Sequence, residues 1–159
     1  MKNIIRRSWA LGLFLILGCS IVLAQTKQAH VHQMGHSVMP FSLAKTLHIF
    51  QMTESGGVER VIVKDAADRD QVTMIQHHLQ IEAGAFQRGD YSDPISLHGA
   101  DMPGLKELQA GAAQIRVSYT ALPKGAEIVF ETSDLRLLTA IHRWFGAQLS
   151  EHGADARTE

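Results

Sequence analysis

Residues 46–64 read TLHIFQMTESGGVERVIVK, and this stretch predicts a β-hairpin. Polar and apolar side chains alternate through residues 46–53, and β-branched residues dominate residues 58–64; both features are typical of strands. The segment between them, Glu54-Ser55-Gly56-Gly57, is a turn signal because glycine adopts positive φ without strain. Two strands joined by so short a turn are expected to pair antiparallel.

A helix and a long loop are predicted after this hairpin. Asp65 or Asp68 can cap the helix, and apolar residues at Val72, Ile75 and Leu79 recur at helical spacing. The helix is expected to run to about residue 87. Residues 88–104 are rich in glycine, proline, serine and aspartate, so we expect a loop of a length that is often functional.

The same order recurs in the second half of the chain. Residues 114–122 alternate, Pro123-Lys124-Gly125 predicts a turn, and residues 126–130 predict the partner strand. Ser133 or Asp134 can cap a last helix that runs to about residue 152. The order ββα-ββα predicts an α+β fold, with a four-stranded antiparallel sheet and two main helices on one face. The single domain is expected to span residues 43–153, followed by a loose tail at residues 154–159.

The N-terminus predicts export. Three basic residues within the first seven precede an apolar run, so residues 1–24 are typical of a signal peptide. Cleavage after Ala24 fits ordinary signal peptidase, whereas Gly18-Cys19 resembles a lipoprotein processing site. We prefer cleavage after Ala24, which predicts a periplasmic or secreted protein. Membrane attachment is expected only through the signal segment or a lipid on Cys19.

Composition narrows the functional classes. The chain has 159 residues, of which 45% are apolar, and this fits one domain with a modest core. A formal net charge of −1 gives no basic surface, so nucleic-acid binding is not expected. The single cysteine falls within the signal segment, which leaves no disulfide and no thiolate ligand in the mature chain. The sequence also lacks the glycine loops of nucleotide-binding proteins and the nucleophile elbow of hydrolases.

Nine histidines are the unusual feature of the chain. Residues 25–42 show neither the helical nor the strand spacing of apolar residues and are predicted to form a mobile tail. Imidazole suits copper, zinc and nickel, and thioether sulfur favours copper(I), so the tail is a candidate for metal capture. The alternative is a polar tail with incidental histidines. The candidate tail ligands are His30, His32, Met34, His36 and Met39.

Two further candidates lie in the folded region. His78 and Glu82 are four residues apart, so they share a helical face and can chelate a metal or act as a base with its orienting carboxylate. His98 and Met102 lie in the predicted loop, with Asp101 between them. The alternatives are a solvated helix flank and a structural loop. We expect a single folded site only if these residues converge.

His48 and His142 are candidates for a cofactor pocket. His48 alternates with Phe50 on a predicted strand, and His142 lies beside the apolar stripe of the last helix. Either can serve as an axial ligand to haem or as a polar contact to a small ligand. The alternative is a hydrogen-bonded core histidine, and His152 is expected to stabilise the end of the helix.

Six further segments of the chain are LHIF (47–50), MTESGGV (52–58), FQRGDYSDP (86–94), HG (98–99), MPGL (102–105) and HRWFGAQ (142–148). Together they resemble a family of small, often exported prokaryotic proteins that carry the label aspartate carbamoyltransferase. The resemblance covers most of residues 43–154 and implies a single domain. Transferases of that name bind carbamoyl phosphate through a Ser-Thr-Arg-Thr loop, which is missing here, so no catalytic residue carries over.

These observations lead to three functional hypotheses. The first is an exported protein that binds a transition metal, with copper as the leading metal, in metal handling or tolerance. The second is a periplasmic module that binds a small ligand or haem. The third is a small hydrolase or transferase in which His78 or His98 acts as a base. Catalysis is not the expected role, and the sequence predicts no protein partner.

Overall fold

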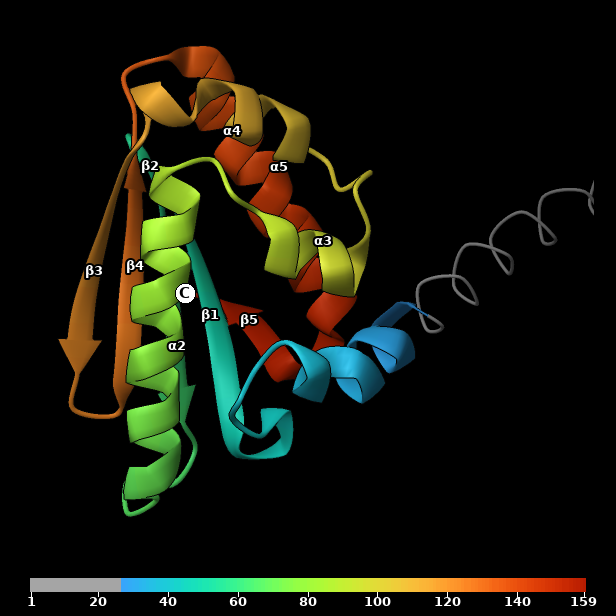
Figure 1. Ribbon diagram of the computed structural model, residues 1–159, viewed down its shortest axis with the longest axis vertical. Helices are drawn as coiled ribbons and strands as arrows, with labels where there is room; N and C mark the ends of the chain where they lie inside the picture. The colour runs from blue at the N-terminus through green and yellow to red at the C-terminus, as the bar shows by residue number, and fades with distance from the viewer. Residues whose placement is uncertain (1–26) are drawn as a thin grey trace, which may run out of the picture.

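The computed structural model describes residues 27–159, and these form a mixed α+β fold built on one sheet (Figure 1). The predicted signal peptide at residues 1–24, with Cys19, lies outside the described residues. The sheet has five strands in the order β3-β4-β2-β1-β5. The α+β class is therefore confirmed, but the sheet is five-stranded and mixed, whereas the sequence predicted four antiparallel strands.

Four of the strands are the two predicted hairpins: β1 (Thr46–Thr53) with β2 (Gly56–Val63), and β3 (Arg116–Leu122) with β4 (Gly125–Glu131). Antiparallel pairing of β2 with β4 joins the hairpins at the centre of the sheet. Gly56 and Gly125 each open the second strand of a hairpin. A Cβ at Gly56 would lie 1.9 Å from the carbonyl oxygen of Phe130, and one at Gly125 would lie 1.9 Å from that of Val61. Only glycine allows this close pairing of the two central strands.

Two long helices cover one face of the sheet (Figure 1). The side chain of Asp68 caps α2 (Arg69–Gln87), and that of Asp134 caps α5 (Leu135–His152). α2 packs mainly over β3 and β4, which come from the second half of the chain, and α5 packs over β1, β2 and the C-terminal β5. The two halves therefore share one core, which includes the fully buried Trp144 and Phe130.

The stretch that the sequence indicated as a long loop, residues 88–104, contains one short helix, α3 (Ser92–His98), and a second short helix, α4 (Leu105–Gly111), follows it. A 3-10 turn, η3 (Ala112–Gln114), leads into β3. Tyr91 fixes the start of α3 because its ring is buried between Phe86, at a centroid distance of 4.8 Å, and Trp144, at 5.4 Å. These aromatic contacts hold the first turn of α3 close to α2.

The predicted N-terminal tail is ordered differently from the expectation. Residues 27–34 are helical, and the 3-10 turns η1 (Gly35–Ser37) and η2 (Leu43–Lys45) follow. Val31 is 2% exposed and Met39 is 6% exposed, and both belong to the main hydrophobic core. The sequence predicted a mobile metal-binding tail here. In the structure, apolar side chains of this segment are instead buried against the rest of the domain.

The predicted C-terminal tail also joins the fold. A 3-10 turn, η4 (Gly153–Asp155), leads into β5 (Ala156–Thr158). This strand pairs in parallel with β1, and Ala156 aligns with His48. β5 supplies hydrogen-bonding partners to an edge of β1 that would otherwise stay unpaired. The residues that the sequence left as a loose end are thus the fifth strand.

None of the helices in residues 27–159 is long and apolar enough to cross a lipid bilayer.

The N-terminal packing is testable by substitution. We expect Val31→Ala to lower the free energy of unfolding by about 1–3 kcal/mol, because it removes buried methyl groups and leaves a cavity. Gln33→Ala, at an exposed position on the same segment, should change it by less than about 0.5 kcal/mol. Urea unfolding followed by circular dichroism measures both values. Equal stability of the two variants would contradict the packing described here.

Candidate functional site

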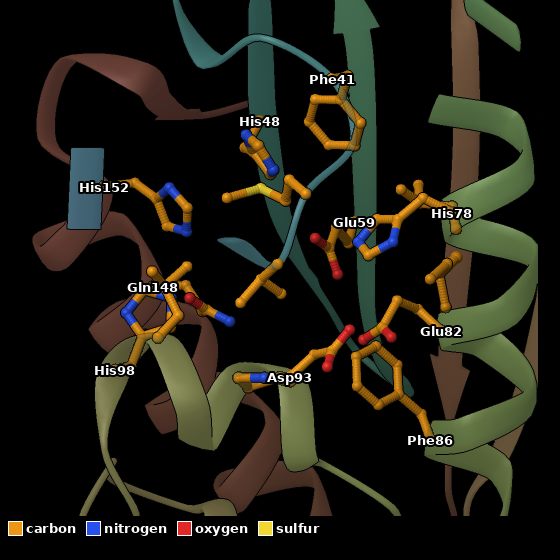
Figure 2. Close-up of a pocket in the computed structure, with 16 residues that line it drawn as sticks. Phe41, His48, Glu59, His78, Glu82, Phe86, Asp93, His98, Gln148 and His152 are labelled. Carbon is orange, nitrogen blue, oxygen red and sulfur yellow. The ribbon is translucent and has the colours of Figure 1, made fainter. Parts of the chain in front are cut away.

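A polar cavity lies over the sheet between α2 and α5, where the two helices pack on different strands (Figure 2). α3 and residues 38–41 close it. Its volume of about 60 Å³ accommodates a few water molecules or a metal ion with its waters. The polar side chains that line it are His48, Glu59, His78, Glu82, Asp93, His98, Gln148 and His152.

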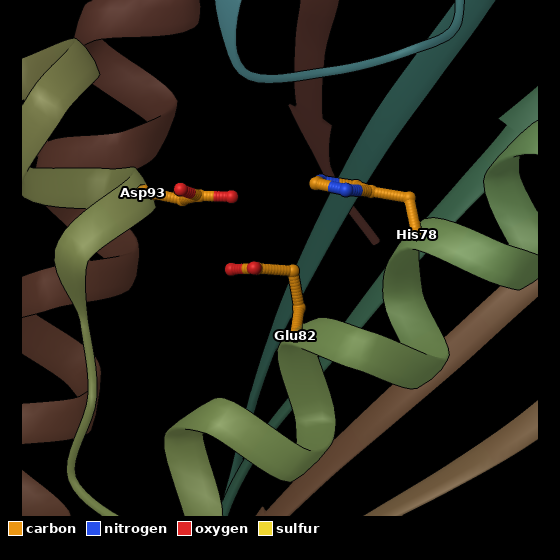
Figure 3. Close-up of side chains that lie close together, drawn as sticks. All are labelled: His78, Glu82 and Asp93. Atoms are coloured by element: carbon orange, nitrogen blue, oxygen red, sulfur yellow. The ribbon is translucent and has the colours of Figure 1, made fainter.

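One end of the cavity gathers potential metal ligands, and we call His78, Glu82 and Asp93 the acidic triad (Figure 3). Each residue offers one ligand atom, and these atoms all lie within 4.8 Å of one another. Within residues 27–159 this is the one such group of three or more histidine, cysteine, aspartate or glutamate residues. His78 and Glu82 come from successive turns of α2, as the sequence predicted, and Asp93 comes from the first turn of α3.

Glu59 adds a third carboxyl group at this end. It lies on β2, and its side chain points into the cavity near His78 and Glu82 (Figure 2). Its strand neighbours on the same face are the buried Val61 and Val63. An ionisable group on this apolar face is costly unless it is protonated, paired or bound to a metal.

The buried carboxyl groups hold their protons unusually tightly. Burial, the nearby Asp93 charge and a hydrogen bond with Asp93 raise the pKa of Glu82 to about 8. Burial also raises the pKa of Glu59 to about 7. At neutral pH Glu82 therefore carries a proton that it shares with Asp93. Burial lowers the pKa of His78, so its imidazole is neutral and can donate a lone pair to a metal.

The other end of the cavity is formed by three histidines, and we call His48, His98 and His152 the imidazole cluster. The ring centroids of His48 and His152 are 4.8 Å apart, and those of His98 and His152 are 5.0 Å apart. His48 lies on β1, His98 ends α3, and His152 ends α5. Sequence reasoning assigned His152 to the end of the helix, and the structure adds that its ring is buried in the cavity.

The histidines of the imidazole cluster differ in the hydrogen-bond partners of their Nδ1 atoms. His98 Nδ1 lies 3.0 Å from Glu151 Oε2, and Lys27 Nζ lies 2.6 Å from the other oxygen of that carboxylate. By contrast, His48 Nδ1, His152 Nδ1 and Gln148 Oε1 are buried without a hydrogen-bond partner. Buried polar atoms in proteins are nearly all hydrogen-bonded, so water or a ligand in the cavity is expected to supply the partners of these three.

The tail candidates do not gather into one site in this structure. His32 Nδ1 pairs with Asp155 at 2.6 Å, and His36 Nδ1 donates to the carbonyl of Gln33 at 2.8 Å. His30 and Met34 lie on the surface. Met39 alone lines the polar cavity. The predicted tail ligands are thus divided between the surface and the cavity.

The remaining candidates occupy other places. His142 donates from Nε2 to the carbonyl oxygens of Thr53, at 3.0 Å, and Gly56, at 2.9 Å, so it fixes the turn between β1 and β2. It therefore does not face His48 across the cavity. Met102 is buried in the hydrophobic core. Asp101 pairs with Lys106, and the carboxylate that contacts His98 is Glu151.

Sequence reasoning missed Glu59, Asp93, Gln148 and Glu151 as site residues. Glu59 carried a signal, since it is the charged member of an alternating run whose neighbours Val61 and Val63 are apolar. Asp93 carried none, because its position depends on the short helix α3. Gln148 and Glu151 follow helical spacing on α5, but the sequence does not indicate which element they face.

No protein-family model, no curated protein and no solved structure matches this chain. The resemblance to small exported proteins labelled aspartate carbamoyltransferase therefore stays a prediction. The assignment of a function depends on the geometry and chemistry of the cavity.

The buried groups predict a loss of stability above about pH 6.5. Glu82 and Glu59 keep protons that the unfolded chain has lost above about pH 4.5, so their contribution falls as the pH rises toward 8. The pKa of His48 is lowered to about 4 by burial, and that of His152 is also lowered. Between about pH 4.5 and 6.5 the unfolded chain binds protons at these histidines, which offsets the effect of the two glutamates, so the net fall is expected above pH 6.5.

Urea unfolding of metal-free protein at about pH 5, 6.5 and 8.5 tests this profile. Glu82→Gln should reduce the fall between about pH 6.5 and 8.5 to the part that Glu59 contributes below about pH 7, because glutamine cannot ionise. A wild-type stability that rises steadily to about pH 8.5 would contradict a protonated Glu82 in the folded protein.

Proposed function

We propose that this protein binds a divalent transition-metal ion at the acidic triad and serves in metal handling. The observation that carries the proposal is the convergence of His78, Glu82 and Asp93, whose ligand atoms lie within 4.8 Å of one another. They line a cavity of about 60 Å³, which has room for an ion and its waters. A metal about 2.1 Å from each ligand requires small closing movements of these side chains. The predicted signal peptide favours a role outside the cytoplasm.

The donor chemistry favours zinc or copper(II). One imidazole and two carboxylates offer nitrogen and oxygen ligands, with Glu59 nearby as a further carboxylate. Such a site holds copper(II) more tightly than zinc by the usual order of affinities. We therefore propose copper(II) or zinc as the bound ion, since carboxylates are also suitable ligands for zinc. Two ionised carboxylates also balance a charge of +2 where burial makes an uncompensated charge costly.

The size of the cavity favours an ion over an organic cofactor. Pockets that enclose drug-sized ligands have volumes of roughly 300–1,000 Å³. This cavity, at about 60 Å³, is several times smaller. Haem binding would need a large opening between α2, α3 and α5, whereas metal binding needs only side-chain adjustment. The His98–Glu151 pair has the form of a base with its orienting carboxylate, but the same volume argues against an organic substrate.

Metal binding should displace a proton. In the metal-free protein Glu82 shares a proton with Asp93, and a metal ion replaces it as the partner of both carboxylates. The cation thus removes the like-charge repulsion that keeps Glu82 protonated. This exchange relates the high pKa of Glu82 to a binding function.

We expect zinc affinity to fall by about 100-fold or more in His78→Gln, because loss of a direct ligand costs at least as much as loss of an outer-shell partner. His77→Gln is the matched control, since His77 is the adjacent histidine of α2 and is exposed. Isothermal titration calorimetry with Zn²⁺ and Cu²⁺ on the mature protein measures both variants. Titration in two buffers of different ionisation enthalpy measures the released proton.

A second comparison separates the cavity from the N-terminal segment. Replacing His30, His32 and His36 together by glutamine should leave the strongest site intact. Substitution is preferable to deletion because the segment buries Val31 and Met39 in the core. Loss of tight binding in this triple variant, with retention in His78→Gln, would refute the proposal.

A further inference from the structure

We propose that the imidazole end of the cavity is a second metal site, which binds copper(I) through His48, His152 and Met39. The acidic triad uses none of these residues. The inference is independent of the proposed divalent site, because each end of the cavity has its own donors. His98 contacts His152 and completes the cluster as a fourth potential donor.

The first support is the number of free lone pairs at this end. His48 Nδ1 and His152 Nδ1 are buried without partners, and the two residues are 4% and 6% exposed. Leaving such atoms unsatisfied is unfavourable, because each has lost its hydrogen bonds to water without gaining another. A ligand that accepts electron pairs from both rings removes this cost. Two stacked imidazoles that each bury an Nδ1 without a partner are better explained by a bound species than by packing alone.

The second support is the orientation of His98. Its Nδ1 donates to Glu151, which leaves the lone pair of the neutral ring on Nε2. A carboxylate that fixes the tautomer in this way is the usual outer partner of a metal-binding histidine. Glu151 is itself held by Lys27, at 2.6 Å, so its carboxylate is positioned from the opposite side.

The charge of this end selects the ion. His48, His152 and Met39 line the same end of the cavity and supply imidazole and thioether donors, with no carboxylate among them, whereas two of the three residues of the acidic triad are carboxylic acids. Thioether sulfur favours copper(I). Without ionised ligands, a buried divalent ion would cost about four times as much solvation free energy as a monovalent one, since this cost follows the square of the charge. The neutral end therefore suits Cu⁺, and the acidic end suits a divalent ion.

Binding requires a small rearrangement of the rings. The ligand atoms of the imidazole cluster do not lie within 4.8 Å of one another as those of the acidic triad do. Rotation about the last side-chain torsion of histidine is soft, and the rings adjoin open space in the cavity. The expected movement is a rotation of His48 and His152 toward a common point, with the backbone of β1 and α5 in place.

Competition with the chromophoric chelator bicinchoninate tests the site. Mature protein is titrated anaerobically into the Cu⁺–chelator complex, and the loss of chelator absorbance gives affinity and stoichiometry. We expect wild-type protein and His78→Gln to withdraw one copper each. His152→Gln should weaken the affinity by at least 100-fold. Met39→Leu, which keeps the volume of the side chain, should weaken it by about 10-fold.

X-ray absorption at the copper edge gives an independent readout. Wild-type protein should show nitrogen and sulfur neighbours, and Met39→Leu should show nitrogen neighbours alone. Because Met39→Leu preserves the fold, it decides the outcome if His152→Gln fails to fold. Unchanged copper(I) affinity in Met39→Leu and no sulfur neighbour in the wild type would overturn the proposal. Loss of the copper in the His30/His32/His36 triple variant would overturn it as well, and loss in His78→Gln alone would assign the copper to the acidic triad.

Discussion

The antiparallel pairing of β2 with β4 is the constraint on which the rest of this structure depends. It joins two hairpins into one sheet, and it requires glycine at positions 56 and 125, where any Cβ would strike the carbonyl of the neighbouring strand. α2 then packs mainly on β3 and β4, and α5 packs on β1, β2 and β5, so the two helices lie over different parts of the sheet. The space between them is filled by α3, the N-terminal segment and a set of polar side chains. The cavity is therefore a product of the way in which the two halves are joined.

Filling this space with ionisable groups is unfavourable for folding. Glu59 and Glu82 remain protonated well above the usual pH, and His48 and His152 remain neutral well below theirs. An apolar set of similar volume would avoid these costs. Polar groups that reduce stability and gather in one place are typical of binding sites, and the two ends of this cavity differ in the chemistry that they offer. Carboxylates at one end suit a divalent ion, and neutral imidazoles with a thioether at the other suit a monovalent one.

Much of the fold could be predicted from local pattern. β1 was predicted with its observed bounds, and Asp68 and Asp134 were among the predicted helix caps. β5 could not be predicted, because Ala156–Thr158 has no strand pattern of its own and is held by the open edge of β1. The N-terminal segment was misjudged for a related reason, since Val31 and Met39 find apolar partners only once the sheet and its helices have assembled.

The site was predictable to the extent that it depends on helical spacing. His78 and Glu82 were identified because residues four apart share a helix face, whereas Asp93 approaches them only through the placement of α3. His48, His78 and His98, which the sequence offered as separate candidates, line one cavity together with His152, whereas His142 lies outside it. The choice between His142 and His152 depends on which turn of α5 faces the cavity, and both turns carry apolar neighbours in the sequence.

A crystal structure of the mature protein loaded with zinc, with diffraction data collected on both sides of the zinc absorption edge, would locate the bound ion. We expect an anomalous peak inside the cavity, within bonding distance of His78, Glu82 and Asp93. Peaks confined to the surface histidines His30, His32 and His36, with none in the cavity, would contradict the proposed site.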